Sequence, residues 1–313
     1  MSSITVDSIE QAARRIAPHV RRTPLWRLAS TELGLPGPRF EVWLKLEHLQ
    51  LSGSFKARGM FNRLLSHTLP KAGAIIASGG NAGIATATAA RALGVPAEVF
   101  VPGTSPLTKR DRLAALGARV QVVGTTYAEA LAACEARQRE TGALMTHAYD
   151  QPEVVAGAGT LAREIELEAG LPDQMLVSVG GGGLVAGIAA WCAGRCAVIG
   201  LEPTLAPTLH RARAAGAPVD VTVGGIAADS LGAQRVGRIA WQITHAHLAD
   251  CLLLDDDAIR DAQRFLWREF RLAVEPGAAL PLAALRSGLV TPKAGHKVCL
   301  IVCGANVDPA SLA

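Results

Sequence analysis

Residues 175–190 read MLVSVGGGGLVAGIAA, an apolar run interrupted by four consecutive glycines. The surrounding segment 175–194 is uncharged over 20 positions, about the length of a membrane-spanning helix. A glycine inside a helix costs roughly 1 kcal/mol relative to alanine, so a helix through Gly180–Gly183 is disfavoured. The run instead predicts a buried strand over 175–179, a glycine turn, and a helix over 184–192.

A strand that ends in a glycine turn and opens a helix forms an anion site. Bare backbone N–H groups converge there at the positive end of the helix dipole, and a phosphate is the expected guest. A second interpretation is a dinucleotide-binding fingerprint, with Gly181, Gly183 and Ala186 in the pattern and Glu202 as the ribose-binding acid. Close packing of helix on strand is a third.

Elsewhere, short β-branched runs alternate with longer Ala- and Arg-rich amphipathic segments. Strands are expected at 42–47, 73–78, 97–102, 119–124, 143–147, 175–179, 197–202, 251–255 and 297–304. Helices are expected at 82–93, 105–116, 126–141, 153–169 and 257–270, and within the first 20 residues. This alternation predicts an α/β fold with more than one sheet, each mostly parallel and flanked by helices.

Composition and charge exclude several classes of protein. The net charge is +4, and no basic stripe interleaves with aromatic residues, so neither nucleic-acid binding nor membrane association is expected. The N-terminal segment contains acidic residues, unlike a signal peptide. The six cysteines form no CxxC pair, which favours free thiols in a reducing, cytoplasmic setting.

A second glycine-rich turn occurs at ASGGNAGIATA, residues 77–87, again after an apolar strand. Ser78, Gly79, Gly80 and Asn81 can form a second nest of N–H groups. Asn81 stands where a helix cap is expected, but its amide can also donate to a ligand oxygen. Two nests in one chain suggest a ligand system with two anionic ends, such as a phosphate and a carboxylate.

The segment SGSFKARGM, residues 52–60, carries Lys56 between small and bulky neighbours. Only six of the 31 basic residues are lysine. Arginine cannot lose its proton, whereas a lysine in a partly desolvated pocket can, and can then attack a carbonyl. The neighbours predict a tight turn that presents Lys56 inward; a surface lysine near a helix start is the alternative. A lysine with two anion nests points to pyridoxal phosphate and an amino-acid substrate.

The C-terminal segment KVCLIVCGANVD, residues 297–308, delivers Cys303 to a glycine turn. A buried structural thiol is one interpretation. In a pyridoxal phosphate site, the thiol would instead face the pyridine nitrogen, which it cannot keep fully protonated as a carboxylate would. Such a site would favour rapid loss of a leaving group over a long-lived carbanion.

Together these motifs resemble the type II family of pyridoxal phosphate enzymes, and within it the serine/threonine dehydratases. The matching stretches are EHLQLSGSFKARGM, SGGNAG, SVGGGGL, GLEP, LAVEPGAALPLAAL and VCGAN, with SGGNAG most similar to catabolic serine dehydratase. The resemblance runs from Arg21 to the end of the chain. It implies a two-domain fold like that of the tryptophan synthase β chain. The large cofactor-binding domain would comprise 1–46 and 148–313, and the small domain 47–147.

The resemblance also implies roles for individual residues. Lys56 would hold the cofactor aldehyde as a Schiff base and then act as the base on the substrate Cα. The other cofactor contacts would be Phe55, Asn81, Gly180, Gly181, Gly182, Gly183, Leu184, Glu275 and Cys303. The substrate contacts would be Ser78, Gly79, Gly80 and Ala82. A monovalent cation such as potassium would lie at Glu202, Ala206 and Thr208.

The implied reaction is α,β-elimination of a β-hydroxy amino acid, such as L-serine or L-threonine, to a 2-oxo acid and ammonia. Family racemases carry a serine where this chain has Gly79, so poor racemisation is expected. The alternatives are a β-replacement synthase of the same fold, similar to cysteine synthase, a nicotinamide-dependent oxidoreductase, and a non-catalytic homologue. Relatives are usually dimers, so a homodimer is expected.

Overall fold

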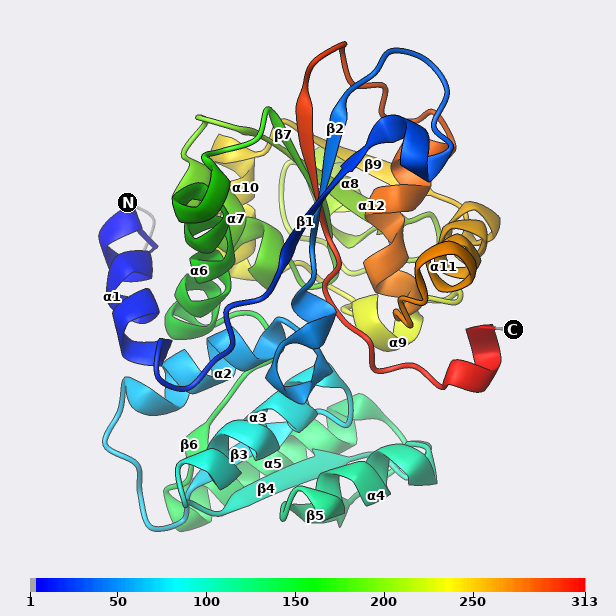
Figure 1. The fold of residues 1–313 in the computed structure, drawn as a ribbon. Coiled ribbons are helices and arrows are strands. Elements are labelled where there is room, and N and C mark those ends of the chain that lie inside the picture. Colours follow the sequence, from blue (N-terminus) through cyan, green and yellow to red (C-terminus); the bar gives the residue numbers. More distant parts are fainter. Residues whose placement is uncertain (1–3, 313) are drawn as a thin grey trace.

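The computed structural model describes residues 4–312 and contains two sheets (Figure 1). The larger sheet has the strand order β1-β2-β10-β7-β8-β9, and the smaller has the order β5-β4-β3-β6. The larger sheet consists of β1 Leu25–Ala29, β2 Glu41–Lys45, β7 Gln174–Ser178, β8 Ala197–Pro203, β9 Asp250–Leu254 and β10 Lys297–Ile301. The smaller consists of β3 Ala74–Ala77, β4 Ala97–Val101, β5 Arg119–Val122 and β6 Leu144–Met145. Strands β1 and β2 pair antiparallel, and the other pairings are parallel.

Helices cover both faces of the larger sheet (Figure 1). One side carries α1 Val6–Ile16, α6 Pro152–Ala169, α7 Gly183–Cys192 and α10 Arg238–His247. The other carries α9 Ala228–Leu231, α11 Asp256–Phe270 and α12 Pro276–Arg286. Helix α8 Thr208–Ala215 follows β8 and contacts β8 and β9. The smaller sheet is flanked by α3 Asn81–Ala92, α4 Leu107–Ala115 and α5 Tyr127–Thr141, and α2 Lys56–Leu65 packs against α3 and α6.

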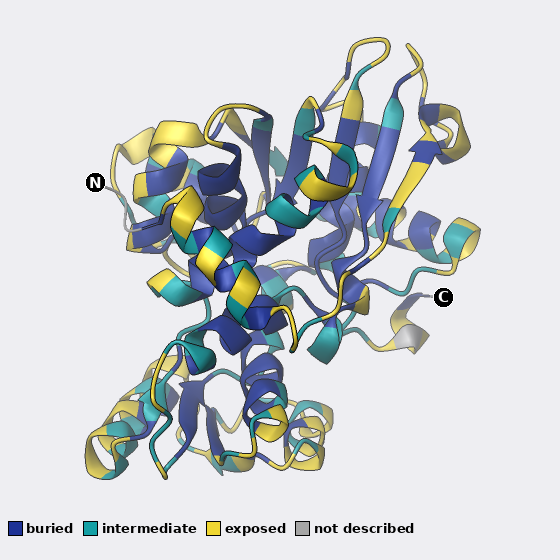
Figure 2. Ribbon diagram, turned by 60° about the vertical axis from the view of Figure 1, so that its left-hand side comes forward, coloured by how far each residue is buried: buried dark blue, intermediate teal, exposed yellow. Residues whose placement is uncertain are grey.

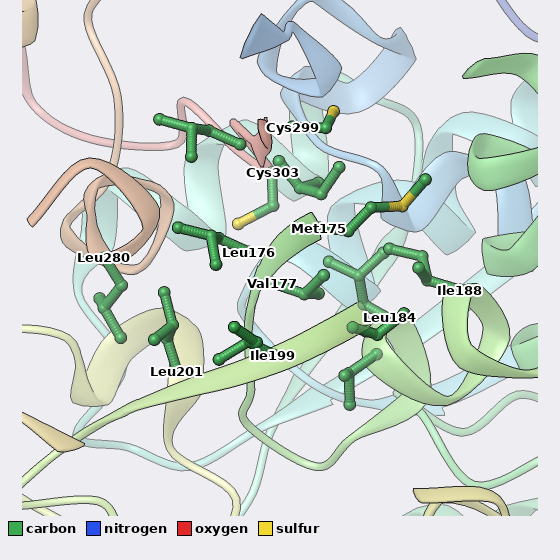
Figure 3. Packing of buried hydrophobic residues seen from close by; sticks show 14 of the residues in the cluster. Met175, Leu176, Val177, Leu184, Ile188, Ile199, Leu201, Leu280, Cys299 and Cys303 are labelled. Carbon is green, nitrogen blue, oxygen red and sulfur yellow. The ribbon is translucent and has the colours of Figure 1, made fainter. Parts of the chain in front are cut away.

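The central strands are buried on both faces, as expected for parallel strands between helices (Figure 2). Met175 of β7 pairs with Cys299 of β10 near the middle of the larger sheet. Ile188 of α7 and Leu280 of α12 belong to the same buried cluster (Figure 3). Helix α7 is buried all round, so it can begin directly at the glycine turn and remain fixed against the sheet.

The fold predicted from the sequence is confirmed. All nine expected strands and the expected helices are present, with ends displaced by a few residues. Strand β1 was not expected. The tight turn before Lys56 exists, with positive φ at Ser52 and Gly53, but Lys56 itself begins a ten-residue helix. The smaller sheet is built from residues 74–145, and the proposed domain boundaries at 47 and 147 stay a prediction.

All six cysteines are free and buried. Cys134 lies in a cluster of the smaller sheet, and the other five lie in the core of the larger sheet. Over residues 4–312, none of the helices combines the length and apolar character needed to cross a bilayer.

Candidate active site

A pocket lies where the glycine turn, the start of α2 and the segment after β10 meet. All of the predicted cofactor contacts line it, together with residues that the sequence did not single out. Its lining is Phe55, Lys56, Asn81, Tyr149, Ser178, Gly180, Gly181, Gly182, Gly183, Leu184, Ser230, Leu231, Glu275 and Cys303. Segments distant in sequence thus contribute to one site.

Lys56 is the first residue of α2 and is partly buried. Its Nζ donates to the carbonyl oxygen of Ala148 at 2.6 Å and lies 5.2 Å from the centre of the Phe55 ring. Burial lowers the pKa of Lys56 to about 8, although the charge of Glu275 acts in the opposite direction. A substantial fraction of this amine is therefore neutral near physiological pH, as a nucleophile or base requires.

The glycine turn is a cradle in which side chains have little room. A Cβ on Gly181 would lie 2.3 Å from the Tyr149 ring, and one on Gly182 would lie 2.6 Å from the Cβ of Ala240. Gly182 also has φ 89°, a left-handed conformation that favours glycine. The carbonyl of Gly181 accepts from the amide of Gly237 at 3.0 Å, which fixes the turn against the start of α10.

The amides of this turn are free to bind a ligand. Within the described chain, the N–H groups of Gly180–Leu184 donate no hydrogen bond to another protein group. The hydroxyl of Ser178 also lines the pocket, is buried, and has no hydrogen-bond partner among the described residues. Unpaired donors at the start of α7 fit a phosphate, because buried polar groups are normally satisfied.

Asn81, Glu275 and Asn306 form a hydrogen-bonded chain at the pocket edge. The Asn81 amide donates to both carboxylate oxygens of Glu275 at 2.9 Å, and the Asn306 amide donates to Asn81 Oδ1. Burial raises the pKa of Glu275, which Asn81 partly offsets. The Asn81 side chain thus reaches the pocket from the start of α3, rather than serving as an N-cap.

Cys303 follows β10 and is 3% exposed. Its carbonyl accepts from the Phe55 amide at 3.1 Å, so the thiol segment is tied directly to the start of α2. Burial, reinforced by the charge of Glu275, raises the pKa of the Cys303 thiol. The thiol is therefore neutral at physiological pH.

The predicted substrate contacts lie beside the pocket rather than in its lining. Ser78, Gly79 and Gly80 form the turn between β3 and α3, and Ala82 is buried in the first turn of α3. A Cβ on Gly80 would lie 3.7 Å from the carbonyl of Asp229 in α9. The turn thus faces α9 next to the pocket residue Ser230.

The three residues expected to hold a cation are close in sequence, near the end of β8. Glu202 is fully buried, and its carboxylate accepts from the amides of Leu209 at 2.7 Å and His210 at 2.8 Å, the first turn of α8. Burial raises the pKa of Glu202 to about 7. Ala206 is buried, and the Thr208 hydroxyl donates to the Ala233 carbonyl.

Sequence reasoning missed Tyr149, Ser178 and Asn306. Ser178 carried a signal, since it ends β7 and is the one polar residue in the apolar run 175–179. Asn306 stood inside a quoted motif without an assigned role. Tyr149 carried none, because its contact with Gly181 depends on the packing of α6 against α7.

The residues of the pocket fit pyridoxal phosphate: a lysine amine, a phosphate cradle, and a neutral thiol and an amide in the same lining. The family model described as pyridoxal-phosphate dependent enzyme matches residues 16–304. The chain belongs to this family, and pyridoxal phosphate is its cofactor. The match favours a phosphate turn over the dinucleotide interpretation of Gly180–Gly183.

Individual relatives show which enzymes of this family the chain is similar to. The chain is 37% identical over 310 residues to L-threonine ammonia-lyase of Geobacter sulfurreducens, covering 96% of this chain and 75% of that protein. It is 34% identical to phenylserine dehydratase of Ralstonia pickettii, covering 96% and 92%. Among solved structures, maize serine racemase superposes with a TM-score of 0.91 at 29% identity, covering 99% and 96%. A threonine deaminase from T.th. superposes with a TM-score of 0.89 at 34% identity, covering 97% and 99%. These matches place the chain among pyridoxal phosphate enzymes of the type II fold.

Proposed function

We propose that this enzyme catalyses α,β-elimination of a β-hydroxy amino acid, such as L-serine or L-threonine, to a 2-oxo acid and ammonia. The observation that carries the proposal is the Lys56 amine, whose pKa burial lowers to about 8, in one pocket with the free glycine amides and a neutral thiol. Among relatives, L-threonine ammonia-lyase and phenylserine dehydratase are named for eliminations of this class.

The residues divide the work as follows. When bound, pyridoxal phosphate would supply an aldehyde that reacts with the amines of Lys56 and of the substrate. It would also supply a ring that withdraws electrons from Cα. The amides of Gly180–Leu184 would bind the phosphate, and Asn81 would hydrogen-bond the ring hydroxyl. Ser78, Gly79 and Gly80 bind the substrate carboxylate, which orients the Cα–H bond toward Lys56. The neutral Lys56 amine would then accept the Cα proton. The β-hydroxyl would take up a proton and leave as water, and hydrolysis of the enamine product would give the 2-oxo acid and ammonia.

Cys303 and Gly79 are the two residues that favour elimination over racemisation. The neutral Cys303 thiol would face the ring nitrogen and would not keep it protonated, so negative charge would be poorly stabilised and departure of the β-hydroxyl favoured. Gly79 offers no base on the face opposite Lys56, so protonation from that side, which racemisation needs, has no donor there. We therefore propose elimination over racemisation, although serine racemases are among the structural relatives.

We further infer a homodimer in the cytoplasm, by analogy with the family, and a potassium ion near Glu202, Ala206 and Thr208. Glu202 supports the cation because its buried carboxylate has a pKa raised to about 7, and a bound cation would stabilise the ionised form. Gel filtration with light scattering tests the dimer, and activity with potassium replaced by sodium tests the ion.

The deciding experiment combines spectroscopy with a substrate panel. Purified enzyme should absorb in the visible, and borohydride reduction followed by peptide mapping should find the cofactor on Lys56. 2-Oxo acid release is then measured with L-serine, L-threonine, 3-phenylserine and 3-hydroxyaspartate. Lys56→Ala should abolish the band and the release, whereas Lys71→Ala should retain both.

Two results would redirect the proposal. A yellow enzyme that releases oxo acid from none of these amino acids, but consumes a thiol cosubstrate, would be a β-replacement synthase. A label on a residue other than Lys56 would contradict the proposed site.

A further inference from the structure

Three buried charged side chains, Lys45, Glu47 and Arg58, and the partly buried Glu164 form a cluster next to the start of α2. Arg58, two residues after Lys56, is 1% exposed and lies between two carboxylates. Its Nε and Nη2 donate to Glu47 at 2.8 and 2.7 Å, and Nη2 also donates to Glu164 at 3.0 Å. Lys45 completes the cluster by donating to Glu164 at 2.6 Å. We call these four residues the Arg58 cluster.

The Arg58 cluster connects α2, which begins at Lys56, with α6 and with the chain segment that follows β2. Lys45 ends β2, which pairs with β10, the strand that leads to Cys303. Glu47 lies in the short helix after β2, Arg58 in α2, and Glu164 in α6. The Thr23 carbonyl and the Thr160 hydroxyl supply further partners. Two positive and two negative charges give a neutral set with paired hydrogen bonds.

Within the cluster, Arg58 and Glu47 each favour the ionised form of the other despite their burial. Burial alone would raise the pKa of Glu47, but the charge and hydrogen bonds of Arg58 outweigh it and lower this pKa. Burial alone would likewise lower the pKa of Arg58, but Glu47 and Glu164 raise it. A bidentate guanidinium–carboxylate fork fixes relative orientation more tightly than a point charge does.

Backbone contacts carry that orientation to Lys56. A Cβ on Gly157 of α6 would lie 2.6 Å from the Arg58 carbonyl, so α2 and α6 touch backbone to backbone. The Arg58 amide donates to the Phe55 carbonyl at 3.0 Å, and the Phe55 amide donates to the Cys303 carbonyl at 3.1 Å. Helix α2 therefore cannot turn about its axis without breaking the fork, the helix contact or the Cys303 link.

We propose that Arg58 is a positioning residue for Lys56. Its fork to Glu47 and Glu164 sets the rotation of the first turn of α2 and thereby places the Lys56 amine in the pocket. Arg58 touches neither substrate nor cofactor and acts through the helix that it anchors. The inference rests on the proposed role of Lys56 as the cofactor-binding lysine.

The test compares Arg58→Lys, which keeps the charge and loses the fork, with wild type. The matched control is Arg137→Lys, because Arg137 makes the same two-pronged contact with Glu98 in the smaller sheet, at 3.1 and 3.3 Å. We expect kcat of Arg58→Lys to fall about 10- to 100-fold, with KM changed much less, because misplacing a reacting group costs rate of this size. The control should behave as wild type.

A second readout reports on Lys56 without catalysis. The rate at which apoprotein takes up pyridoxal phosphate, followed by visible absorbance, depends on the neutral amine. Its midpoint should lie near pH 8 in wild type, since burial lowers the pKa of Lys56 to about 8. The titratable groups facing Lys56 are Cys303, Glu275 and His147. In Arg58→Lys, a loosened helix admits water, and the midpoint should move to higher pH.

A purely structural role predicts a different pattern. The double variant Glu47→Leu/Arg58→Met replaces the buried pair by apolar side chains of similar size, a change that often preserves folding. If this variant melts like wild type yet shows the lowered kcat and shifted midpoint, positioning is supported. If it, or a folded Arg58→Lys, takes up cofactor and turns over as wild type does, the inference is overturned.

Borohydride mapping of wild type separates this inference from the proposed function. If the label is on Lys56 but the Arg58 variants keep the wild-type kcat and uptake midpoint, only the positioning role of Arg58 is overturned. A label elsewhere would overturn the proposed function as well.

Discussion

Cys303 and Glu202 show how burial sets the protonation of single residues in this enzyme. Both side chains are buried in the core of the larger sheet, and burial raises the pKa of each. The consequence for the charge at physiological pH differs, because a thiol and a carboxyl group start from different ordinary pKa values. Cys303 becomes a thiol that stays neutral at every physiological pH. Glu202, with a pKa of about 7, becomes a group that titrates where most carboxylates do not.

The thiol at position 303 should make elimination fast. Cys303→Asp would place a carboxylate beside Glu275, and would hold a proton on the ring nitrogen that the thiol does not. We expect oxo-acid formation to slow at least about tenfold, a barrier increase of roughly 1.4 kcal/mol, and exchange of the Cα proton with solvent to rise relative to elimination. Mass spectrometry of residual L-serine after reaction in deuterium oxide measures the exchange. Cys303→Ser, neutral and similar in size, is the control, and an Asp variant with unchanged kcat would contradict the assigned role.

Glu202 should make stability depend on pH. Its folded pKa is raised from an ordinary 4.5 to about 7, so the folded state holds the proton more tightly. This contribution is fully present below pH 4.5 and is lost as pH rises through about 7, a decrease of about 3 kcal/mol. Glu202→Gln should remove this part of the slope in urea unfolding between pH 5 and 7.5 in potassium-free buffer. Equal slopes in both proteins would contradict the assignment.

At the scale of elements, the strand–turn–helix unit of β7, Gly180–Gly183 and α7 explains why sequence alone located most of the site. Four glycines after an apolar strand can form few structures, and the anion cradle follows from helix geometry. The partners that complete the cradle come from other elements. Tyr149 precedes α6 and closes on Gly181, a contact that no local pattern encodes.

Strand β1 and the start of helix α2 are features of the fold that the local sequence did not predict, because other elements stabilise them. Strand β1, LWRLA, buries only Leu28 among its five residues, because it is an edge strand paired on one side. It therefore lacks the continuous apolar run of the central strands. The neighbours of Lys56, among them Arg58 and Gly59, predict a tight turn, with a helix start only as the alternative, whereas the structure has both the turn and the helix. Arg58 and Gly59 fit only because α6 supplies Gly157 and Glu164 at the contact.

The cradle gives a sharp element-scale prediction. Gly181→Ala would put a Cβ 2.3 Å from the Tyr149 ring, so the turn or the ring must shift and the phosphate amides lose their convergence. We expect the cofactor to bind about 10- to 100-fold more weakly, the cost of one or two hydrogen bonds to a charged group. Equilibrium dialysis against pyridoxal phosphate measures this.

Two companions make that experiment selective. Gly224→Ala is the matched control, since no atom lies within 4 Å of its added Cβ. Tyr149→Ala in combination with Gly181→Ala should recover part of the lost affinity, because the ring that blocks the new methyl group is gone. A Gly181→Ala variant that binds as wild type does would show that the cradle adapts.

For the whole molecule, the pocket joins the two sheets. Asn81, which follows the smaller sheet, bonds to Glu275 at the start of α12, and Lys109 of α4 pairs with Asp229 of α9. A ligand held between these parts binds the folded state alone. Cofactor at 100 times its dissociation constant should therefore raise the free energy of unfolding by about 2.7 kcal/mol.

Urea unfolding of apoprotein with and without pyridoxal phosphate tests this linkage. Lys56→Ala, which keeps the cradle but cannot form the covalent bond, should gain much less at the same cofactor concentration. Stabilisation of both proteins by the same amount would mean that the phosphate contacts, and not the lysine, provide most of the binding.

Because all six cysteines are buried, their reaction with a thiol reagent can report on local unfolding of the protein. Cys303 lines the pocket, but a small thiol-alkylating reagent can modify any of the other cysteines only after the surrounding core has parted. Cys134 would report on the smaller sheet, and the other four thiols of the larger sheet would report on the other core. Mass spectrometry of pulse-alkylated peptides would then show, without any engineered label, which of the two cores unfolds locally first. The same experiment with cofactor would show whether the cofactor slows local unfolding of both.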